Sequence, residues 1–310
     1  METLCGAACV VVLVAVQMQL LMVCAAAAVW AALGADRLVG LLALWLAWVW
    51  PRAPETNGGG PWPRFRDASF WTAARAFFDA TVSFGTGAAR AASGRPVIFF
   101  CFPHGALALA SSFVYARDVF APFSPTDDWR IAVAPAIFRL PLIREGTLWS
   151  GGVSATKASF RAAVSSGFSV CVYPGGAEEA MLNRGHEGTQ RAVQLRISPR
   201  LLRLALELDV AVVPVYTLGE LEALTPVLPL GAELTRGCAK RFKVAPILPV
   251  GRAPLLPRPA KMRTLVGAPV KACSEESLRA AVEEGVRALY AELAAGLPGR
   301  ATAELVFSTE

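Results

Sequence analysis

The clearest structural signal in the sequence is Pro96-Val97-Ile98-Phe99-Phe100-Cys101-Phe102, followed at once by Pro103-His104-Gly105. Six consecutive apolar residues bounded by prolines predict a strand buried on both faces, as in the interior of a parallel sheet. Four further apolar runs predict strands of the same kind: Ile131–Ala134, Ser169–Tyr173, Val210–Tyr216 and Thr264–Val266.

Segments with helical periodicity separate these runs. They are Ser69–Ala80, Ser154–Ser165, Pro199–Leu208 and Ser274–Ala295. The last begins with Ser274-Glu275-Glu276-Ser277, which predicts a capped start with acidic residues in the first turn. Alternating strands and helices predict an α/β fold, a mixed sheet flanked by helices.

The N-terminus predicts a membrane anchor. Between Ala7 and Leu33 the strongly polar residues are Gln17 and Gln19, and the run exceeds the roughly 20 residues that span a bilayer. A second apolar run, Leu38–Trp50, carries three tryptophans and is short for a span. We therefore expect an N-terminal transmembrane helical hairpin over residues 1–50 whose second arm is tilted or re-entrant. A cleavable signal peptide is disfavoured, because the chain begins Met1-Glu2-Thr3 without a basic region.

The remaining chain divides into a linker and a catalytic domain. Residues 51–66 (PRAPETNGGGPWPRFR) are rich in proline and glycine, so no regular element is expected there. Residues 67–310 are then long enough for one large domain with its own core. Apolar residues also fill the expected loops Leu221–Leu230 and Ile247–Leu256, which predicts that this domain dips into the membrane surface.

Composition limits the partners. The chain is 55% hydrophobic and 17% charged with mean hydropathy +0.46, which is too apolar for an ordinary water-soluble domain. The net charge of +6 comes from dispersed basic residues, which disfavours nucleic acid and leaves membrane headgroups or a phosphate-bearing substrate. The seven scattered cysteines include no CxxC pair and predict neither a disulfide framework nor a metal site. They fit a reducing, cytosol-facing compartment.

Two histidines restrict the search for a neutral-pH base. His104 directly follows the predicted strand Pro96–Phe102, and strand-end loops commonly hold active sites in α/β folds. His186 lies in a polar, glycine-flanked loop that predicts an exposed residue. A structural histidine capping a turn is the alternative for His104. Cys101, three residues earlier, suggests an acyl-enzyme intermediate, but a cysteine on an apolar strand more often is an inert buried thiol.

The run Phe102-Pro103-His104-Gly105 resembles a block of the type-2 acyl-CoA:diacylglycerol acyltransferases, where the family usually reads HPHG or EPHG. Further segments resemble that family in the same order, from about Val97 to the last helix: Arg139–Glu145 with Ser150–Val153, Val172–Glu179, Val213–Glu220, Gly251–Pro257 and Val266–Pro269. Phe102 and Leu218 depart from the family pattern, as does Ser198–Leu201, where the family reads RxGF. These departures bear on the acceptor more than on the reaction.

The resemblance implies a transfer of a fatty acyl group from acyl-CoA to a lipid hydroxyl. His104 would be the general base and Glu179 would orient it, with an exposed carboxylate as the alternative for Glu179. Arg139 and Arg144 would bind the phosphates of coenzyme A. The implied substrate-binding residues are Pro103, Gly105, Arg139, Arg144, Glu145, Gly151, Gly152, Pro174, Gly175, Gly176 and Glu220. The paired glycines would direct backbone N–H groups to the oxyanion or to phosphates, or they form ordinary turns.

The expected reaction esterifies diacylglycerol to triacylglycerol without a metal or a resident cofactor, acyl-CoA being a substrate. Monoacylglycerol, a fatty alcohol or a sterol is an alternative acceptor, and a catalytically inactive lipid-binding membrane protein is the alternative from another class. The absence of a GxSxG motif disfavours a serine lipase. The glycerol-phosphate acyltransferase pattern fails because Leu109, not aspartate, stands five positions after His104. The resemblance also implies a multi-pass protein of the endoplasmic reticulum membrane with a cytosolic catalytic domain, with lipid droplets as a second location and a homo-oligomer left open.

Overall fold

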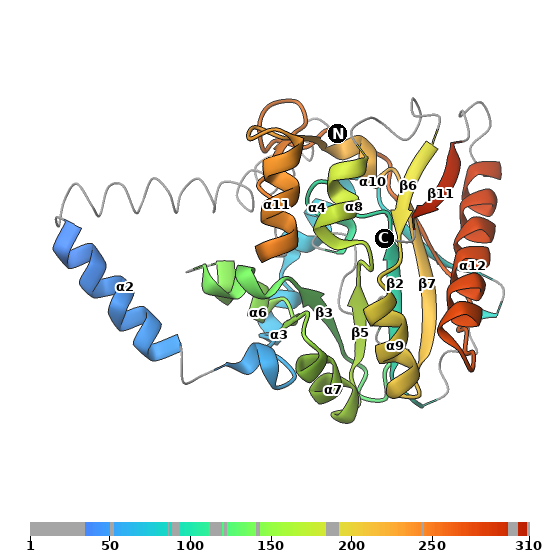
Figure 1. Ribbon diagram of the computed structural model, residues 1–310, viewed down its shortest axis with the longest axis horizontal. Coiled ribbons are helices and arrows are strands. Elements are labelled where there is room, and N and C mark those ends of the chain that lie inside the picture. The colour runs from blue at the N-terminus through green and yellow to red at the C-terminus, as the bar shows by residue number, and fades with distance from the viewer. Residues whose placement is uncertain are drawn as a thin grey trace.

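A seven-stranded mixed sheet in the order β1-β10-β7-β2-β5-β3-β4 forms the centre of the molecule (Figure 1). The computed structural model describes residues 35–49, 53–85, 87–88, 94–111, 120, 123–140, 143–183, 192–242, 245–296 and 303–308. The strands of this sheet are β1 (Thr81–Phe84), β2 (Val97–Phe102), β3 (Trp129–Val133), β4 (Gly152–Ser154), β5 (Ser169–Val172), β7 (Ala211–Leu218) and β10 (Arg263–Val266).

Strand β2 is the central strand, and all six of its residues are buried. It runs parallel to β5 on one side and to β7 on the other, with Phe99 opposite Cys171 and Val213. Only an apolar sequence tolerates cover on both faces, which explains the unbroken run VIFFCF. Because β2, β5 and β7 are parallel, their carboxyl ends lie at one edge of the sheet. Strand β10 pairs antiparallel with β7 and makes the sheet mixed.

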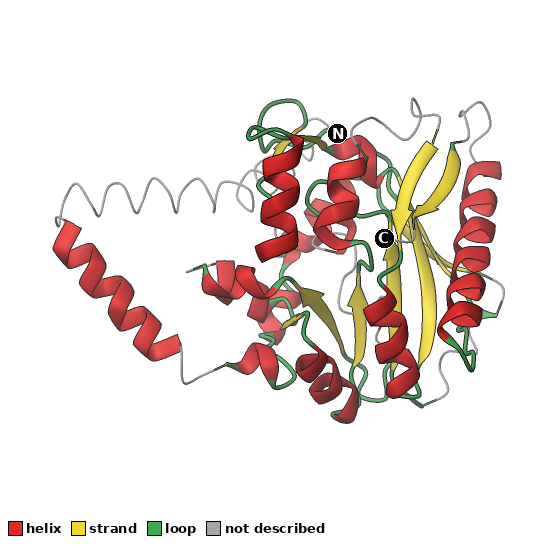
Figure 2. Ribbon diagram, viewed as in Figure 1, coloured by secondary structure: helices red, strands yellow, loops and turns green. Residues whose placement is uncertain are grey.

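Two apolar cores cover the two faces of the sheet. Phe99 and Cys101 point into one core, which α4 (Ser69–Phe77) helps to close, while Phe100 and Phe102 point into the other. Helices α7 (Lys157–Ser165), α9 (Pro199–Glu207) and α12 (Glu275–Ala295) contribute side chains to the second core. Figure 2 shows the helices in red around the yellow sheet. The expected mixed sheet flanked by helices is therefore confirmed.

Local sequence explains where these helices begin. Thr156 accepts a hydrogen bond from the Ser159 backbone at the start of α7. Ser274 and Ser277 form a reciprocal capping box at α12, as the sequence predicted. Pro199 occupies the first turn of α9, where its missing N–H has no partner to lose.

Smaller elements complete the chain. Two short sheets pair β6 (Ala192–Arg196) with β11 (Glu304–Ser308) in parallel, and β8 (Thr225–Val227) with β9 (Leu248–Val250) antiparallel. The short helices are η5 (Pro135–Arg139), α6 (Ile143–Trp149), α8 (Gly176–Leu182), α10 (Glu220–Ala223) and α11 (Ala232–Phe242). The segments expected as loops around residues 221–230 and 247–256 thus contain a helix turn and two strands.

The N-terminal hairpin is described in part. Helix α2 (Ala35–Val49) covers most of the expected second arm, with Val39, Leu41 and Leu44 exposed. The expected first arm, residues 7–33, lies outside the described residues. Among the residues that are described, no helix combines the length and the apolar character needed to cross a bilayer.

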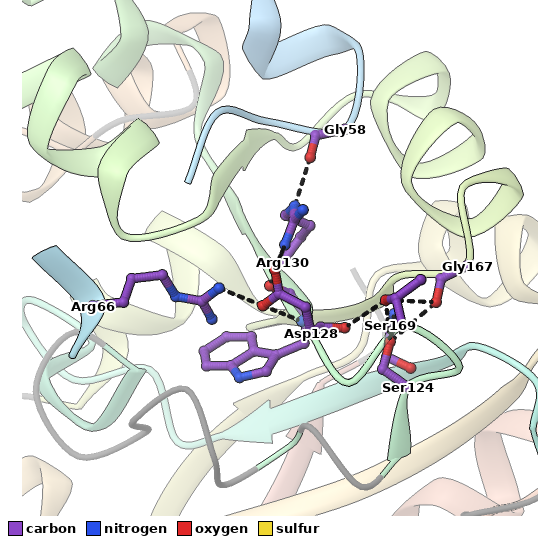
Figure 3. A network of polar contacts seen from close by, with 9 residues as sticks. Gly58, Arg66, Ser124, Asp128, Arg130, Gly167 and Ser169 are labelled. Atoms are coloured by element: carbon purple, nitrogen blue, oxygen red, sulfur yellow. Dashed lines mark hydrogen bonds and ion pairs between the residues drawn. The ribbon is translucent and has the colours of Figure 1, made fainter. Parts of the chain in front are cut away.

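The stretch 51–66 was expected to lack regular structure, and this is wrong for its described part. It contains η1 (Pro54–Thr56) and α3 (Pro63–Arg66), because prolines at both starts favour a helical turn and the following residues pack on the sheet. Arg66 and Arg130 both bind Asp128, whose carboxylate lies between the two guanidinium groups (Figure 3). Burial opposes ionisation of Asp128, but its bonds to the two arginines outweigh burial and lower its pKa.

A second ion-pair group fastens the same stretch. Arg144 in α6, only 3% exposed, lies 3.0 Å from Glu55 and 3.2 Å from Glu145. Arg130 also donates to the Gly58 carbonyl, and the Trp62 backbone N–H donates to the Trp149 carbonyl. Residues 55–66 are thereby held against the β3–β4 side of the sheet.

Candidate active site

The carboxyl ends of three neighbouring parallel strands bring the central site residues together. His104 follows β2, Glu179 lies in α8 just after β5, and Glu220 follows β7. Pro103 and Gly105 flank His104, and Pro174, Gly175 and Gly176 form the turn between β5 and α8. The sequence therefore placed these candidates at one edge of the sheet, where α/β folds commonly bind ligands.

The imidazole of His104 is oriented by its own loop. Its Nδ1 lies 2.6 Å from the Gly105 carbonyl oxygen. A carbonyl oxygen only accepts hydrogen bonds, so Nδ1 carries the proton and Nε2 keeps its lone pair. The Tyr173 ring lies edge-on to the imidazole with centroids 5.1 Å apart. The loop thus selects the tautomer in which Nε2 can take a proton.

Burial also favours the neutral form of this histidine. The ring is partly covered by its surroundings, and desolvation lowers the pKa of His104 below its ordinary value, against a smaller opposing effect of backbone hydrogen bonds. At neutral pH the imidazole is therefore uncharged. A neutral imidazole with a free Nε2 has the state required of a general base.

Glu179 contacts the backbone of His104 and not its ring. Its Oε1 accepts the His104 N–H at 2.5 Å, and its Oε2 accepts the Arg196 N–H at 2.8 Å. The side chain is fully buried, and this burial raises the pKa of Glu179 to about 8 although both bonds and the charge of Arg196 favour ionisation. The expected alternative of an exposed carboxylate is wrong. Glu179 positions the loop that carries His104, whereas Gly105 positions the ring.

Glu220 holds the far end of the same loop. Its two carboxylate oxygens accept the N–H groups of Leu109 at 2.6 Å and Ala110 at 2.8 Å, and the side chain is 1% exposed. Gly105 approaches it so closely that a Cβ there would lie 2.9 Å from Oε1. The described contacts of Glu220 are structural, and its expected contact with substrate stays a prediction.

The glycines of the β5–α8 turn are required by close packing. A Cβ at Gly175 would lie 2.1 Å from Oε2 of Glu179, and Gly176 has a positive φ of 52°. The Gly176 N–H donates to the Tyr173 carbonyl at 3.1 Å, as in an ordinary turn. The Gly151 N–H likewise donates to the Leu148 carbonyl at 2.9 Å. These two N–H groups are engaged, so an oxyanion or phosphate contact would need them to be released.

The other expected binding residues lie toward the β4 edge of the sheet. Arg139 is exposed at the end of η5, while Arg144 and Glu145 belong to the ion pairs that hold residues 55–66. Gly151 and Gly152 lie at β4, and a Cβ on Gly152 would collide with Thr147. Two strands, β5 and β3, separate β4 from β2. The structure therefore divides the expected site into a central group around His104 and a peripheral group at the β4 edge.

Two residues of the central group were not singled out from the sequence. Tyr173 packs on His104 and accepts the Ser111 N–H at 3.2 Å, and its place just before Pro174 was an available signal. Arg196 binds Glu179 through its backbone, which leaves no trace in the sequence. Among the described residues, no three His, Cys, Asp or Glu side chains are grouped in a way that could hold a metal ion.

The profile of the diacylglycerol acyltransferase family matches residues 32–294. The chain belongs to the diacylglycerol acyltransferase family. The resemblance drawn from the PHG and PGG segments is thus confirmed, as is the expectation of a protein of the acyltransferase class.

Individual relatives of this diacylglycerol acyltransferase family member are distant. Diacylglycerol O-acyltransferase 1 of Eremothecium gossypii is 27% identical over 187 residues, which cover 58% of this chain. The aligned part spans 39% of that relative's length. The solved structure of the 1-acyl-sn-glycerophosphate acyltransferase PlsC from Thermotoga maritima superposes with a TM-score of 0.44 at 17% identity, covering 76% of this chain and 78% of that one.

Proposed function

We propose that this chain transfers a fatty acyl group from acyl-CoA to diacylglycerol and so makes triacylglycerol, with His104 as the general base. The observation that carries the proposal is the contact between His104 Nδ1 and the Gly105 carbonyl, which leaves Nε2 free in a member of this family. Serving as a base is the chemistry that this tautomer and the lowered pKa of His104 favour.

The reaction needs one proton to move twice. Nε2 of His104 takes the proton of the acceptor hydroxyl while the hydroxyl oxygen attacks the thioester carbonyl. The tetrahedral oxyanion then collapses, the carbon–sulfur bond breaks, and the thiolate of coenzyme A takes the proton back from the imidazolium. The products are the ester and the free thiol, so no metal or oxidant is consumed.

Glu179 and Glu220 position the loop that carries His104. Glu179 fixes the His104 backbone at one end, and Glu220 fixes Leu109 and Ala110 at the other. Fixing both ends keeps Nε2 in one position relative to a bound acceptor, which lowers the entropic cost of reaching the transition state.

The proposal includes a membrane setting. Residues 1–34 together with α2 would form the hairpin that anchors the enzyme in the endoplasmic reticulum membrane, with the catalytic domain facing the cytosol and lipid droplets as a second location. The exposed apolar side chains of α2, Val39, Leu41 and Leu44, support contact with lipid. An acceptor dissolved in the bilayer would then reach the site without crossing water. Self-association is compatible with this arrangement.

Membranes of a host that makes no triacylglycerol of its own provide the test. Labelled acyl-CoA is supplied to wild type, His104→Ala and His186→Ala at matched expression, with a panel of acceptors. We expect labelled triacylglycerol from wild type and His186→Ala and a loss of about 100-fold or more in His104→Ala. Equal activity in the two histidine variants would remove His104 from the mechanism. If an ester formed only with another acceptor, that lipid would replace diacylglycerol as the proposed substrate. If no acceptor gave an ester, the enzymatic proposal would be rejected.

A further inference from the structure

Helices α8 and α11 pack against each other (Figure 1). A groove of about 490 Å³ lies between them. Apolar side chains and charged side chains line it together. The apolar ones are Met181, Leu182, Leu228 and Ala232, and the charged ones are Glu178, Arg196, Arg236 and Lys240. A groove of this composition suits a ligand with an anionic end and a less polar chain.

The charge of the groove is unbalanced. Glu178 and Arg196 form an ion pair and neutralise each other. Arg236 and Lys240 are exposed, stand four residues apart on α11 and so share one helix face. Across the described part of the chain, neither of these two cations has an ion pair or a hydrogen bond with another side chain. Two positive charges are therefore available to an anionic ligand.

The groove adjoins the site of His104. The Glu179 carboxyl group accepts the backbone N–H of His104 through one oxygen and that of Arg196 through the other. Arg196 lines the groove, so a single carboxyl group separates a groove wall from the catalytic loop. The groove and the loop that carries His104 are therefore neighbours on the two sides of Glu179.

Two other groups of cations are already neutralised. Glu207 pairs with both Lys157 and Arg161 beside a second groove, between α7 and α9. Arg144 pairs with Glu55 and Glu145 on the β4 side. The α8–α11 groove differs because neither Arg236 nor Lys240 forms an ion pair with an acid of the described residues.

We propose that the α8–α11 groove binds the phosphate-bearing end of acyl-CoA, with Arg236 and Lys240 pairing with its phosphates. This deepens the proposed acyl transfer and rests on it. Met181 and Leu228 contact the chain that links the phosphates to the thioester, and the thioester carbonyl reaches Nε2 of His104. Charge-assisted bonds to phosphate then hold the substrate by its non-reacting end, which keeps the reacting end oriented.

Calorimetric binding of free coenzyme A to the full chain in detergent tests the groove independently of turnover. The variants are Arg236→Ala, Lys240→Ala and their double variant. Arg241→Ala is the matched control, because it removes the same charge from the same helix outside the groove. We expect the Kd for coenzyme A to rise about tenfold in the double variant and to stay within twofold in Arg241→Ala. In turnover assays, KM for acyl-CoA rises while KM for the acceptor stays unchanged.

The outcomes separate the groove from the reaction. Unchanged coenzyme A binding in the double variant, with acyl transfer intact, would overturn the groove and leave the proposed function standing. Groove-dependent binding without any acyl transfer by wild type would support the groove and overturn the proposed function. Vesicles of phosphatidylcholine with phosphatidic acid form the last arm. A double variant that loses vesicle binding but keeps coenzyme A binding would identify a lipid-headgroup site and overturn the proposal.

Discussion

Glu179 holds His104 by its backbone N–H, at 2.5 Å, and leaves the imidazole ring to the carbonyl of Gly105. This arrangement separates two tasks that one carboxylate performs in a catalytic triad. The carboxyl group fixes where the loop lies, and the adjacent carbonyl fixes the tautomer. The ring therefore needs no charged partner to present Nε2.

The pH dependence of acyl transfer follows from the state of His104. Burial lowers its pKa below the ordinary value of 6.5, and only the neutral form can accept a proton. We expect the acid limb of kcat/KM to have its midpoint below pH 6.5, since kcat/KM reports groups of the free enzyme. Activity measured between pH 4.5 and 9 at fixed ionic strength checks this. An acid limb centred at or above 6.5 would contradict it.

Glu179 should make the protein less stable as pH rises. Its pKa in the folded protein, about 8, exceeds the ordinary value of 4.5, so folding favours the protonated carboxyl. The contribution of Glu179 to the free energy of unfolding should be highest below about pH 4.5, fall as pH rises from there to about 8, and level off above pH 8. Glu179→Gln cannot ionise, and its amide can accept only one of the two N–H groups. We expect the variant to be less stable than wild type in acid, with the gap narrowing toward pH 8. Parallel denaturant-unfolding curves across this range would refute the assignment.

Two glycine-to-alanine substitutions should have opposite effects. A Cβ at Gly105 would lie 2.9 Å from Oε1 and 3.2 Å from Cγ of Glu220, so Gly105→Ala must displace the catalytic loop. We expect a loss of about 1–3 kcal/mol in unfolding free energy and a lower kcat. Gly146 in α6 has nothing within 4 Å of the place that a Cβ would take, so Gly146→Ala should add about 0.5–1 kcal/mol. Urea unfolding of both variants and the wild type measures these changes in unfolding free energy. Equal effects would mean that Gly105 has more room than the structure gives it.

Removing Asp128 should destabilise the protein strongly. Arg66 and Arg130 are 5% and 4% exposed, and Asp128→Ala would leave both cations buried without their shared carboxylate. The expected loss is about 3–5 kcal/mol of unfolding free energy. Glu207→Ala is the matched control, because Glu207 also pairs with two cations, but all three side chains are exposed. It should change stability little. A comparable loss in the two variants would show that burial is not what makes the Asp128 network important.

The central strands could be predicted because their signal is local. Val97–Phe102 is apolar at every position, and no other element explains such a run beside a proline. The strands Ala192–Arg196 and Glu304–Ser308 were missed. They are short and only partly buried, and each is stabilised by a partner more than 100 residues away. Propensity cannot detect a strand whose stability comes from pairing at that distance.

The site residues differ in the same way in how far the sequence predicts them. His104 could be found because the chain has two histidines and only one follows a buried strand. The role of Glu220 could not, because its contact with Leu109 joins residues 111 positions apart and exists only once β2 and β7 lie side by side. Arg144 was expected to bind phosphate because it lies in a family-like segment and an arginine forms charge-assisted hydrogen bonds with phosphate. Its neutralisation by Glu55 depends on the fold of a stretch that was expected to be irregular.

The ion pairs of residues 55–66 also limit the distance between α2 and the sheet. Glu55, which binds Arg144, comes six positions after Val49, the last residue of α2. Even a fully extended chain of that length spans only about 20 Å. A bilayer that held α2 would thus keep the β3–β4 flank of the sheet close to its surface. A lipid acceptor would then reach the enzyme by lateral diffusion within the membrane, while the water-soluble thiol product would diffuse away into the surrounding solution.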